Sequence, residues 1–259
     1  MDTLQKKNPH PLDKYITFDE GPHIYTIKGN SDFTSVTTWN KSMFSKFDAD
    51  KVIDNMMNSS KWPESKYFNM TKQEIKEAWK KNGIEASSSG TNMHENIEKF
   101  YNDVDIVDDS IEFKYFLSFY EDHKDTLIAY RTEWMIYDEE LKFAGSIDMV
   151  FQDKEGNLHI GDWKRSKEIK KTAFGNKTST NPLIEHIPDS NFWHYALQLN
   201  TYKAILEKNY NKKIKDLFII CLHPENKNNS YLKFKIPDLQ EEVNLLFQER
   251  KNQLNKNNI

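Results

Sequence analysis

Residues 145–164 read GSIDMVFQDKEGNLHIGDWK and contain two aspartates and a lysine within two β-rich segments. Two β-rich segments flank the polar run DKEGN at 153–157, which is typical of a tight turn between antiparallel strands. A register symmetric about Glu155 puts Asp148 directly opposite Asp162, because each lies seven positions from Glu155. Cross-strand partners have Cβ atoms about 4.5–5.5 Å apart. The hairpin therefore predicts two carboxylates side by side on one face of a sheet.

The residues that follow Asp162 add a cation to this pair. Side chains alternate along a strand, so Lys164 shares the face of Asp162 while Trp163 points to the other face. Two neighbouring carboxylates favour a divalent cation between them, and hard oxygen ligands suit Mg²⁺ or Mn²⁺. The main-chain carbonyl of Trp163 is a further candidate ligand. Lys164 is placed to orient or help deprotonate a water, or to stabilise charge developing on a phosphate.

A plainer interpretation competes with this one, because Asp and Lys two positions apart are common on half-exposed strands. Leu158 and Ile160 nevertheless share the face of Asp162, which puts the carboxylate at the edge of a core-facing surface. Burial of a charge is costly, so a carboxylate at such a position is typical of a functional site. The combination of two acids and a lysine around one metal favours phosphodiester hydrolysis.

The pattern of apolar residues predicts how the rest of the chain surrounds the hairpin. A three-stranded antiparallel meander is expected at about 129–137, 142–152 and 158–165. Before it we expect a loose terminus at 1–13, a strand pair within 15–38, helices at about 48–58, 71–86, 92–103 and 111–123, and a flexible run at 87–90. After it we expect a mobile Lys-rich stretch at about 165–190, a helix at 191–208, strands at 217–222 and 230–235, and a helix at about 238–254.

These elements predict an α/β fold in which a mixed central β-sheet is flanked by helices. We expect one domain over residues 1–259. Its parts are an N-terminal hairpin and helical elaboration (1–86), a core (87–235) and a C-terminal helix (236–259).

Composition narrows the class of protein. The chain has 259 residues and a formal net charge of −4, so nucleic acid would be bound through a local basic surface and not through overall charge. The single cysteine, Cys221, excludes an intramolecular disulfide, a Cys-based zinc site and a Cys₄ iron–sulfur cluster. No stretch approaches the ~18 apolar residues of a membrane span, and the N-terminus has no apolar signal region. We therefore expect an intracellular protein without a membrane partner.

The hairpin and two further sequence patterns together make a family resemblance. G-S-I-D followed by D-W-K resembles the PD-(D/E)XK nuclease superfamily, and Asp148, Asp162 and Lys164 fall on its acid, second acid and lysine. Residues 90–98, GTNMHENIE, are similar to the GxxxHxxxE motif of the RecB-like, lambda-exonuclease-like branch, and residues 198–202, QLNTY, are similar to its QxxxY motif. The motifs stand in the family's order over about residues 90–205. The chain also looks similar to the mitochondrial genome maintenance exonuclease type and to nucleases of large DNA viruses.

The resemblance implies a restriction-endonuclease-like core and a role for each motif residue. His94 is implied to be a metal ligand together with Asp148 and Asp162, although a histidine beside an apolar helical stripe, taken alone, is more typical of a core residue. Gln198 and Tyr202 are implied to line the active site. Glu133 is expected as a further ligand or as a group behind the ligands. The implied cofactor is Mg²⁺ or Mn²⁺, and no iron–sulfur cluster is expected.

A local DNA-binding surface is expected around this site. Arg165 and Lys167 are candidates for phosphate contacts. The 87–91 run, through Ser89 and Thr91, is expected to end at a helix N-terminus that favours a phosphate, and Thr37 lies in a second candidate clamp. The aromatic residues that are candidates for stacking on unpaired bases are Phe192, Trp193 and Tyr195.

The function that we expect is a metal-dependent DNA exonuclease acting in replication, repair or recombination. A structure-selective endonuclease on the same fold and a non-catalytic DNA-binding module stay open as alternatives.

Overall fold

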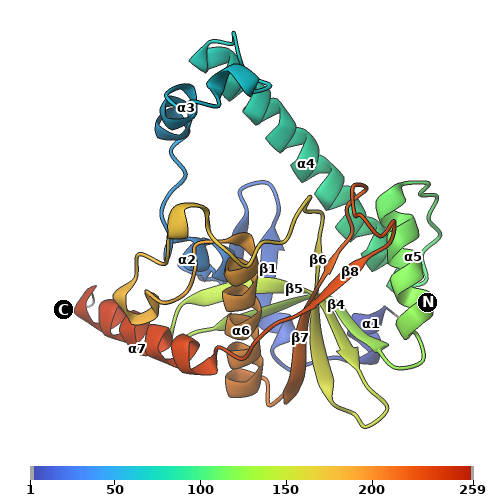
Figure 1. Ribbon diagram of the computed structural model, residues 1–259. Helices are drawn as coiled ribbons and strands as arrows, with labels where there is room; N and C mark the ends of the chain where they lie inside the picture. Colours follow the sequence, from blue (N-terminus) through green and yellow to red (C-terminus); the bar gives the residue numbers. More distant parts are fainter. Residues whose placement is uncertain (1–2, 258–259) are drawn as a thin grey trace.

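A mixed six-stranded β-sheet lies at the centre of the computed structural model, which describes residues 3–257 (Figure 1). Its strands run in the order β3-β5-β6-β7-β8, and β4 also pairs with β5. Their bounds are β3 (Thr34–Ser35), β4 (Ile128–Asp138), β5 (Phe143–Gln152), β6 (Leu158–Lys164), β7 (Ile214–Cys221) and β8 (Leu232–Lys235). A separate two-stranded sheet joins β1 (Ile16–Asp19) to β2 (Ile24–Ile27). The expected α/β class, with a mixed sheet flanked by helices, is confirmed.

Helices cover the sheet and form two hydrophobic clusters with it (Figure 1). The larger cluster packs α6 against the sheet, and the second, mostly aromatic cluster joins the end of α4 and α5 to the strands. Burial of each large apolar side chain contributes about 1.5–3 kcal/mol. The helices are α1 (Leu4–Lys7), α2 (Val36–Lys41), α3 (Ala49–Met57), α4 (Lys72–Tyr101), α5 (Ile111–His123), α6 (Asn191–Asn209) and α7 (Gln240–Asn257), with short 3-10 helices η1 (Asp13–Tyr15), η2 (Trp62–Glu64), η3 (Phe174–Asn176) and η4 (Pro182–Ile184).

The β5–β6 hairpin has the register that the sequence predicts. Met149 pairs with Gly161 and Gln152 pairs with Leu158, so the two strands are symmetric about Glu155. The ladder stops at Met149, one residue before Asp148, while β6 continues through Lys164 paired with β7 alone. Asp148 and Asp162 therefore stand at the fork where β5 and β6 separate.

Strand β5 has three partners, and this leaves an opening beside the fork. Along its whole length β5 pairs with β4. Its other edge pairs with β3 through Phe143 and Ala144 and with β6 from Met149 onward. Among the residues that the structure describes, 145–148 have no strand partner on that edge. The unpaired edge of residues 145–148 can therefore be approached by side chains from other elements.

The prediction of a flexible run at 87–90 is wrong, because α4 is one continuous helix from Lys72 to Tyr101. The capping box of Thr71 and Glu74 starts it. Ile75 is buried near its beginning, and Met93 and Ile97 are buried near its end. Packing at both ends therefore stabilises the helix through residues 87–90, which have low helix propensity. Ser and Gly each cost up to about 1 kcal/mol of helix propensity, which tertiary packing outweighs here. The first part of α4 projects away from the sheet as an arm together with α3 (Figure 1).

The N-terminal segment, expected to be loose, is tied to β4 over the residues that the structure describes. Buried Arg131 donates from Nη1 to Asp13 Oδ2 (2.8 Å) and to the carbonyl of Asn8 (2.9 Å). Trp134 donates from Nε1 to Asp13 Oδ1 (3.0 Å). Three hydrogen bonds to buried side chains of the sheet thus fix this segment. The sequence offered no signal for it, because the partners lie more than a hundred residues apart.

The Lys-rich stretch expected to be mobile contains η3 and η4 and is anchored to the loop after α2. Ser179 donates from Oγ to the carbonyl of Met43 (2.7 Å), and the amide of Thr180 donates to the same carbonyl (2.9 Å). No helix between residues 3 and 257 has the length and apolar character that crossing a bilayer requires.

Candidate metal centre

The side chain of Asp148 closes the fork between β5 and β6. Its Oδ2 accepts a hydrogen bond from the backbone N–H of Trp163 (3.0 Å). Trp163 lies on β6 beyond Gly161, where the pairing of β6 with β5 ends. This bond fixes the orientation of the Asp148 carboxylate, which is 14% exposed. The acid is therefore held in place by the very strand that carries Asp162 and Lys164.

His94 and Glu133 converge on Asp148 from two other elements. His94 Nδ1, on α4, lies 3.5 Å from Asp148 Oδ2 and 3.9 Å from Glu133 Oε1. One ligand atom from each of the three residues lies within 4.8 Å of the others. Helix α4 thus brings His94 to the β5–β6 hairpin.

Glu133 owes its position to a local distortion of β4. Its neighbours Thr132 and Trp134 pair with Met149 and Ile147, so Asp148 is its cross-strand neighbour. The backbone of Glu133 has a φ of 40°, which interrupts the regular pleat. Ser146 holds the carboxylate by donating from Oγ to Oε2 (2.8 Å). The residue expected as a secondary ligand therefore joins the three-residue group directly, and Ser146, which sequence reasoning did not identify, orients it.

Asp162 lies beside this group but is engaged by Lys164. Lys164 Nζ is 2.6 Å from Asp162 Oδ2 and 3.9 Å from Asp148 Oδ2. Asp162 is buried, and its Oδ2 has an ion-pair partner but no hydrogen bond. Burial raises the pKa of Asp162 to about 6, and the negative charge of Asp148 adds to this rise while Lys164 opposes it. Of the expected set of ligands, His94 and Asp148 lie in the group whose atoms are within 4.8 Å of one another, whereas Asp162 lies outside that group and is turned toward Lys164.

The carboxylates determine the charges of the two basic groups. Burial lowers the pKa of Lys164, but Asp162 and Asp148 outweigh burial and leave that pKa above its ordinary value. Burial also lowers the pKa of His94, and Asp148 and Glu133 again reverse the effect and raise it. Lys164 is therefore a cation at neutral pH. Its ammonium group also faces the ring of Tyr195 at 5.1 Å.

The donor atoms fit a divalent cation. The ligand atoms of Asp148, Glu133 and His94 converge within 4.8 Å of one another. The two carboxylates repel each other, and a divalent cation would offset this repulsion together with Lys164. The buried Oδ2 of Asp162 has lone pairs without a hydrogen bond. Carboxylate oxygens suit Mg²⁺ or Mn²⁺, and the imidazole nitrogen shifts the preference toward Mn²⁺. Lys164 Nζ lies 3.4 Å from the carbonyl oxygen of Trp163, the remaining expected ligand.

Gln198, Tyr202 and Thr37 form a chain of contacts at the opening beside β5. Gln198 donates from Nε2 to Tyr202 Oη (3.2 Å) and to Thr37 Oγ1 (3.3 Å). The Tyr202 ring lies directly over Gly145, where an added Cβ would come within 2.8 Å of Cε1. Burial raises the pKa of Tyr202, so its hydroxyl stays protonated. These residues line the opening, whereas the hydrogen-bond and ion-pair partners that the described residues offer Lys164 are Trp163, Asp162 and Asp148.

The expected phosphate-binding residues are arranged differently from the expectation. Ser89 and Thr91 lie inside α4, so the helix N-terminus proposed for them does not exist. Arg165 donates from Nε to Glu112 Oε1 (2.6 Å), and Lys167 Nζ lies 2.5 Å from Glu225 Oε2. Both cations are therefore already paired with carboxylates.

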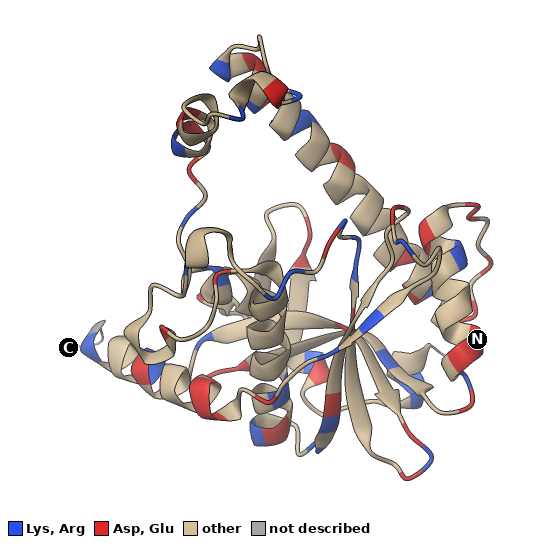
Figure 2. Cartoon of the chain, viewed as in Figure 1, with Lys and Arg blue, Asp and Glu red and all other residues tan. Residues whose placement is uncertain are grey.

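Two of the three aromatic residues expected to stack on bases have other roles. Phe192 is buried in the larger core, and Trp193 donates from Nε1 to the carbonyl of Lys171 (2.9 Å). Tyr195 faces Lys164, as described above. Acidic and basic side chains are interspersed over the elements of the chain (Figure 2), in keeping with its small net charge.

Comparison with known proteins leaves the family open. No family model matches the chain. No curated protein matches it either. Among solved structures 14 chains match. One is described as the crystal structure of SSO0001, which is 12% identical over 87% of this chain and 77% of that chain, with a TM-score of 0.33.

Proposed function

We propose that the protein is a metal-dependent DNA nuclease of the PD-(D/E)XK type that hydrolyses phosphodiester bonds, and specifically an exonuclease. The observation that carries the proposal is the convergence of His94, Glu133 and Asp148 beside the Asp162–Lys164 pair. These five groups come from α4, β4, β5 and β6, and four of them match the family's motif residues. A set of structural ion pairs has no need for three acids at one point, one of them a buried carboxylate whose Oδ2 has an ion-pair partner but no hydrogen bond.

Each group has a defined part in this reaction. His94, Asp148, Glu133 and Asp162 would hold a divalent cation, which supplies Lewis-acid polarisation of a phosphoryl oxygen when bound. Lys164 is a fixed positive charge, and it stabilises the negative charge that develops on the phosphate in the transition state. Its raised pKa argues against a role as the proton acceptor. Trp163 donates to Asp148 and so keeps that carboxylate in register with Lys164.

The proposal is tested with end-labelled single- and double-stranded DNA in Mg²⁺ or Mn²⁺. We expect metal-dependent degradation that Asp162→Asn and Lys164→Ala each reduce by at least about 100-fold, the scale on which loss of a charge-stabilising group acts. His186→Ala and Lys213→Ala serve as matched controls, because His186 pairs with Glu242 of α7 and Lys213 is exposed. No degradation of either substrate, or unchanged cleavage by both active-site variants, would exclude the proposal.

The two alternatives have distinct outcomes in the same assay. A structure-selective endonuclease would cut covalently closed circles, which an obligate exonuclease leaves intact. A non-catalytic DNA-binding module would bind DNA with a salt-sensitive affinity and show no metal-dependent cleavage.

A further inference from the structure

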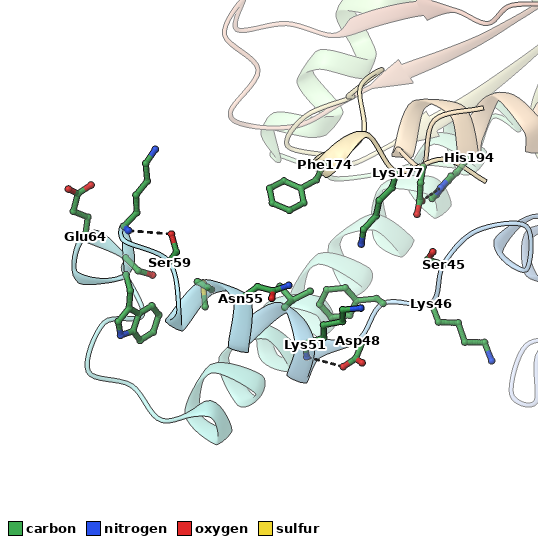
Figure 3. A pocket seen from close by; sticks show the side chains of 17 residues that line it. Ser45, Lys46, Asp48, Lys51, Asn55, Ser59, Glu64, Phe174, Lys177 and His194 are labelled. Atoms are coloured by element: carbon green, nitrogen blue, oxygen red, sulfur yellow. Dashed lines mark hydrogen bonds and ion pairs between the residues drawn. The ribbon is translucent and has the colours of Figure 1, made fainter. Parts of the chain in front are cut away.

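A large cleft lies between the arm and the sheet-bearing body of the molecule (Figure 3). Its volume is about 1230 Å³. The arm side is formed by residues of α3, η2 and the segment that precedes α3, and the body side by residues around η3 and the start of α6. This volume exceeds the roughly 300–1,000 Å³ of typical small-molecule sites, which favours an extended ligand.

Two phenylalanines project into solvent from opposite sides of the cleft. Phe47, on the arm side, is 72% exposed, and Phe174, on the body side, is 93% exposed. Phe47 is backed by Trp79 of α4, whose ring centroid is 5.9 Å away. Rings exposed to this degree stay hydrated unless a ligand covers them. A flat ligand with two accessible faces would stack on them.

The cleft also presents cations without carboxylate partners. Four lysines line it, and within residues 3–257 none of them forms an ion pair: Lys46, Lys51, Lys61 and Lys177. Of the three lining acids, Asp48 caps α3 and Asp189 pairs with His194 at 2.9 Å. Because burial lowers the pKa of His194, the four lysines stand against three acids (Asp48, Glu64 and Asp189), which leaves the lining a formal charge of +1. The lysines without ion-pair partners suit the phosphates of a polyanion.

Elements beside the cleft also carry residues of the candidate metal centre. On the arm side, α4 runs back to His94. On the body side, His194 lines the cleft one helical turn before Gln198 on α6, and its neighbour Tyr195 faces Lys164 at 5.1 Å. A chain-like ligand lying in the cleft would continue toward the fork of β5 and β6.

We propose that this cleft binds an unpaired nucleic-acid strand, with bases stacked on Phe47 and Phe174 and phosphates near the lysines. The inference rests on the nuclease function proposed above and names its substrate as single-stranded. A duplex keeps its base faces inside its own stack, so it offers nothing flat to the two rings. Base–aromatic stacking tolerates any sequence, so the cleft would bind single strands without sequence preference.

Binding of fluorescent oligothymidylate in EDTA tests the proposal without requiring cleavage. We expect Phe47→Ala and Phe174→Ala each to weaken binding by about 5- to 150-fold, the effect of one lost base stack. Phe174→Trp should bind at least as well as the wild type, and Phe174→Leu should be as weak as Phe174→Ala. Lys177→Ala should reduce the salt dependence of log K by about 0.7, the contribution of one phosphate contact to a single strand.

Val107→Ala is the matched control, because Val107 is 96% exposed and does not line the cleft. Wild-type affinity in both phenylalanine variants, equal binding by Phe174→Leu and Phe174→Trp, or tighter binding of a blunt duplex than of oligothymidylate would each overturn the inference. Tight, Phe174-dependent binding without cleavage in Mn²⁺ would instead overturn the nuclease proposal and leave the cleft assignment standing. Full retention of cleavage by both phenylalanine variants would overturn the cleft assignment and leave the nuclease proposal standing.

Discussion

The backbone N–H of Trp163 donates to Asp148 Oδ2 over 3.0 Å at the point where β5 and β6 separate. In a continuous ladder this N–H would face a main-chain carbonyl of the neighbouring strand. Here a side chain takes the place of that carbonyl. The carboxylate that binds Trp163 also lies 3.5 Å from His94, so one residue both closes the sheet and builds the candidate centre.

Substitutions at Asp148 should separate these two roles. Asp148→Asn keeps an oxygen that can accept from Trp163, so we expect its unfolding free energy in EDTA to stay near that of the wild type. Asp148→Ala leaves the N–H without its acceptor and should lose about 1–3 kcal/mol. Both variants should lose most of the stabilisation by Mn²⁺. Urea denaturation with and without Mn²⁺ measures each quantity, and equal stability of the two variants in EDTA would contradict the structural role.

Lys164 should stabilise the fold as well as the proposed reaction. Lys164→Met leaves the buried Asp162 carboxylate without its ion-pair partner, and breaking such a pair costs about 3–5 kcal/mol. The double variant Asp162→Asn/Lys164→Met removes both charges and should recover most of that loss. A double-mutant cycle by urea denaturation at pH 7 checks this expectation. Additive effects of the two substitutions would show that the pair is not coupled.

The hairpin could be read from the sequence because its information is local. The turn at 153–157 fixes the register, and the register aligns Asp148 with Asp162 without any long-range contact. The sequence does not predict that the β5–β6 pairing ends at Met149, because this end depends on the long-range pairing of β6 with β7. The same limit applies to Glu133, whose place in the group depends on a φ of 40° that no residue pattern announces.

The continuity of α4 shows the opposite failure, in which a local signal misleads. Serines and a glycine at 87–90 are typical of a loop, yet buried residues at both ends of the helix hold it together. A helix N-terminus at Thr91 was therefore expected where the chain has only a helix interior. The cleft was missed for a different reason, since Phe47 and Phe174 are far apart in the sequence and line one cleft only because the folded arm faces the body.

Two glycines should respond to alanine in opposite directions. Gly145→Ala places a methyl group 2.8 Å from Tyr202 Cε1, and because that ring is buried the strain should cost about 1–3 kcal/mol and disturb the Gln198–Tyr202 contact. Gly83, within α4, has no atom within 4 Å of an added Cβ, so Gly83→Ala should stabilise the helix by up to about 1 kcal/mol. Thermal denaturation measures the first effect, and hydrogen exchange of the α4 amides measures the second. A neutral Gly145→Ala would contradict the close approach of Tyr202.

The N-terminal segment should contribute to stability through Asp13. Asp13→Ala leaves the guanidinium of Arg131, which is 2% exposed, without its carboxylate, and we expect a loss of about 3–5 kcal/mol. Lys7 and Asp103, 3.7 Å apart, form a matched exposed pair in the same region, and Lys7→Ala should cost less than about 1 kcal/mol. Urea denaturation of both variants makes the comparison. Equal losses would show that Arg131 finds another partner.

Stability without metal should fall as the pH rises through the titration of Asp162. Its pKa of about 6 in the folded chain lies above the ordinary 3.8, so between these values the folded state keeps a proton that the unfolded state has released. The free energy of unfolding therefore decreases with rising pH across about pH 4 to 6. The raised pKa of His94 acts in the same direction, because its contribution is complete below the ordinary value of 6.5 and is lost above the folded value. Asp162→Asn should flatten the part of the curve between pH 4 and 6.

Stabilisation by Mn²⁺ should have the opposite pH dependence. A cation must displace the protons of His94 and Asp162, so its apparent affinity rises with pH, and so does the stabilisation RT ln(1 + [L]/Kd) that it gives the folded chain. We expect the Mn²⁺-induced increase in Tm to be small at pH 5 and large at pH 8. His94→Ala should reduce the increase at pH 8, whereas His186→Ala should leave it unchanged, because His186 pairs with Glu242 of α7 and is not part of the candidate metal centre. An increase that is equal at both pH values would mean that the cation binds elsewhere, since no titrating ligand would then be displaced.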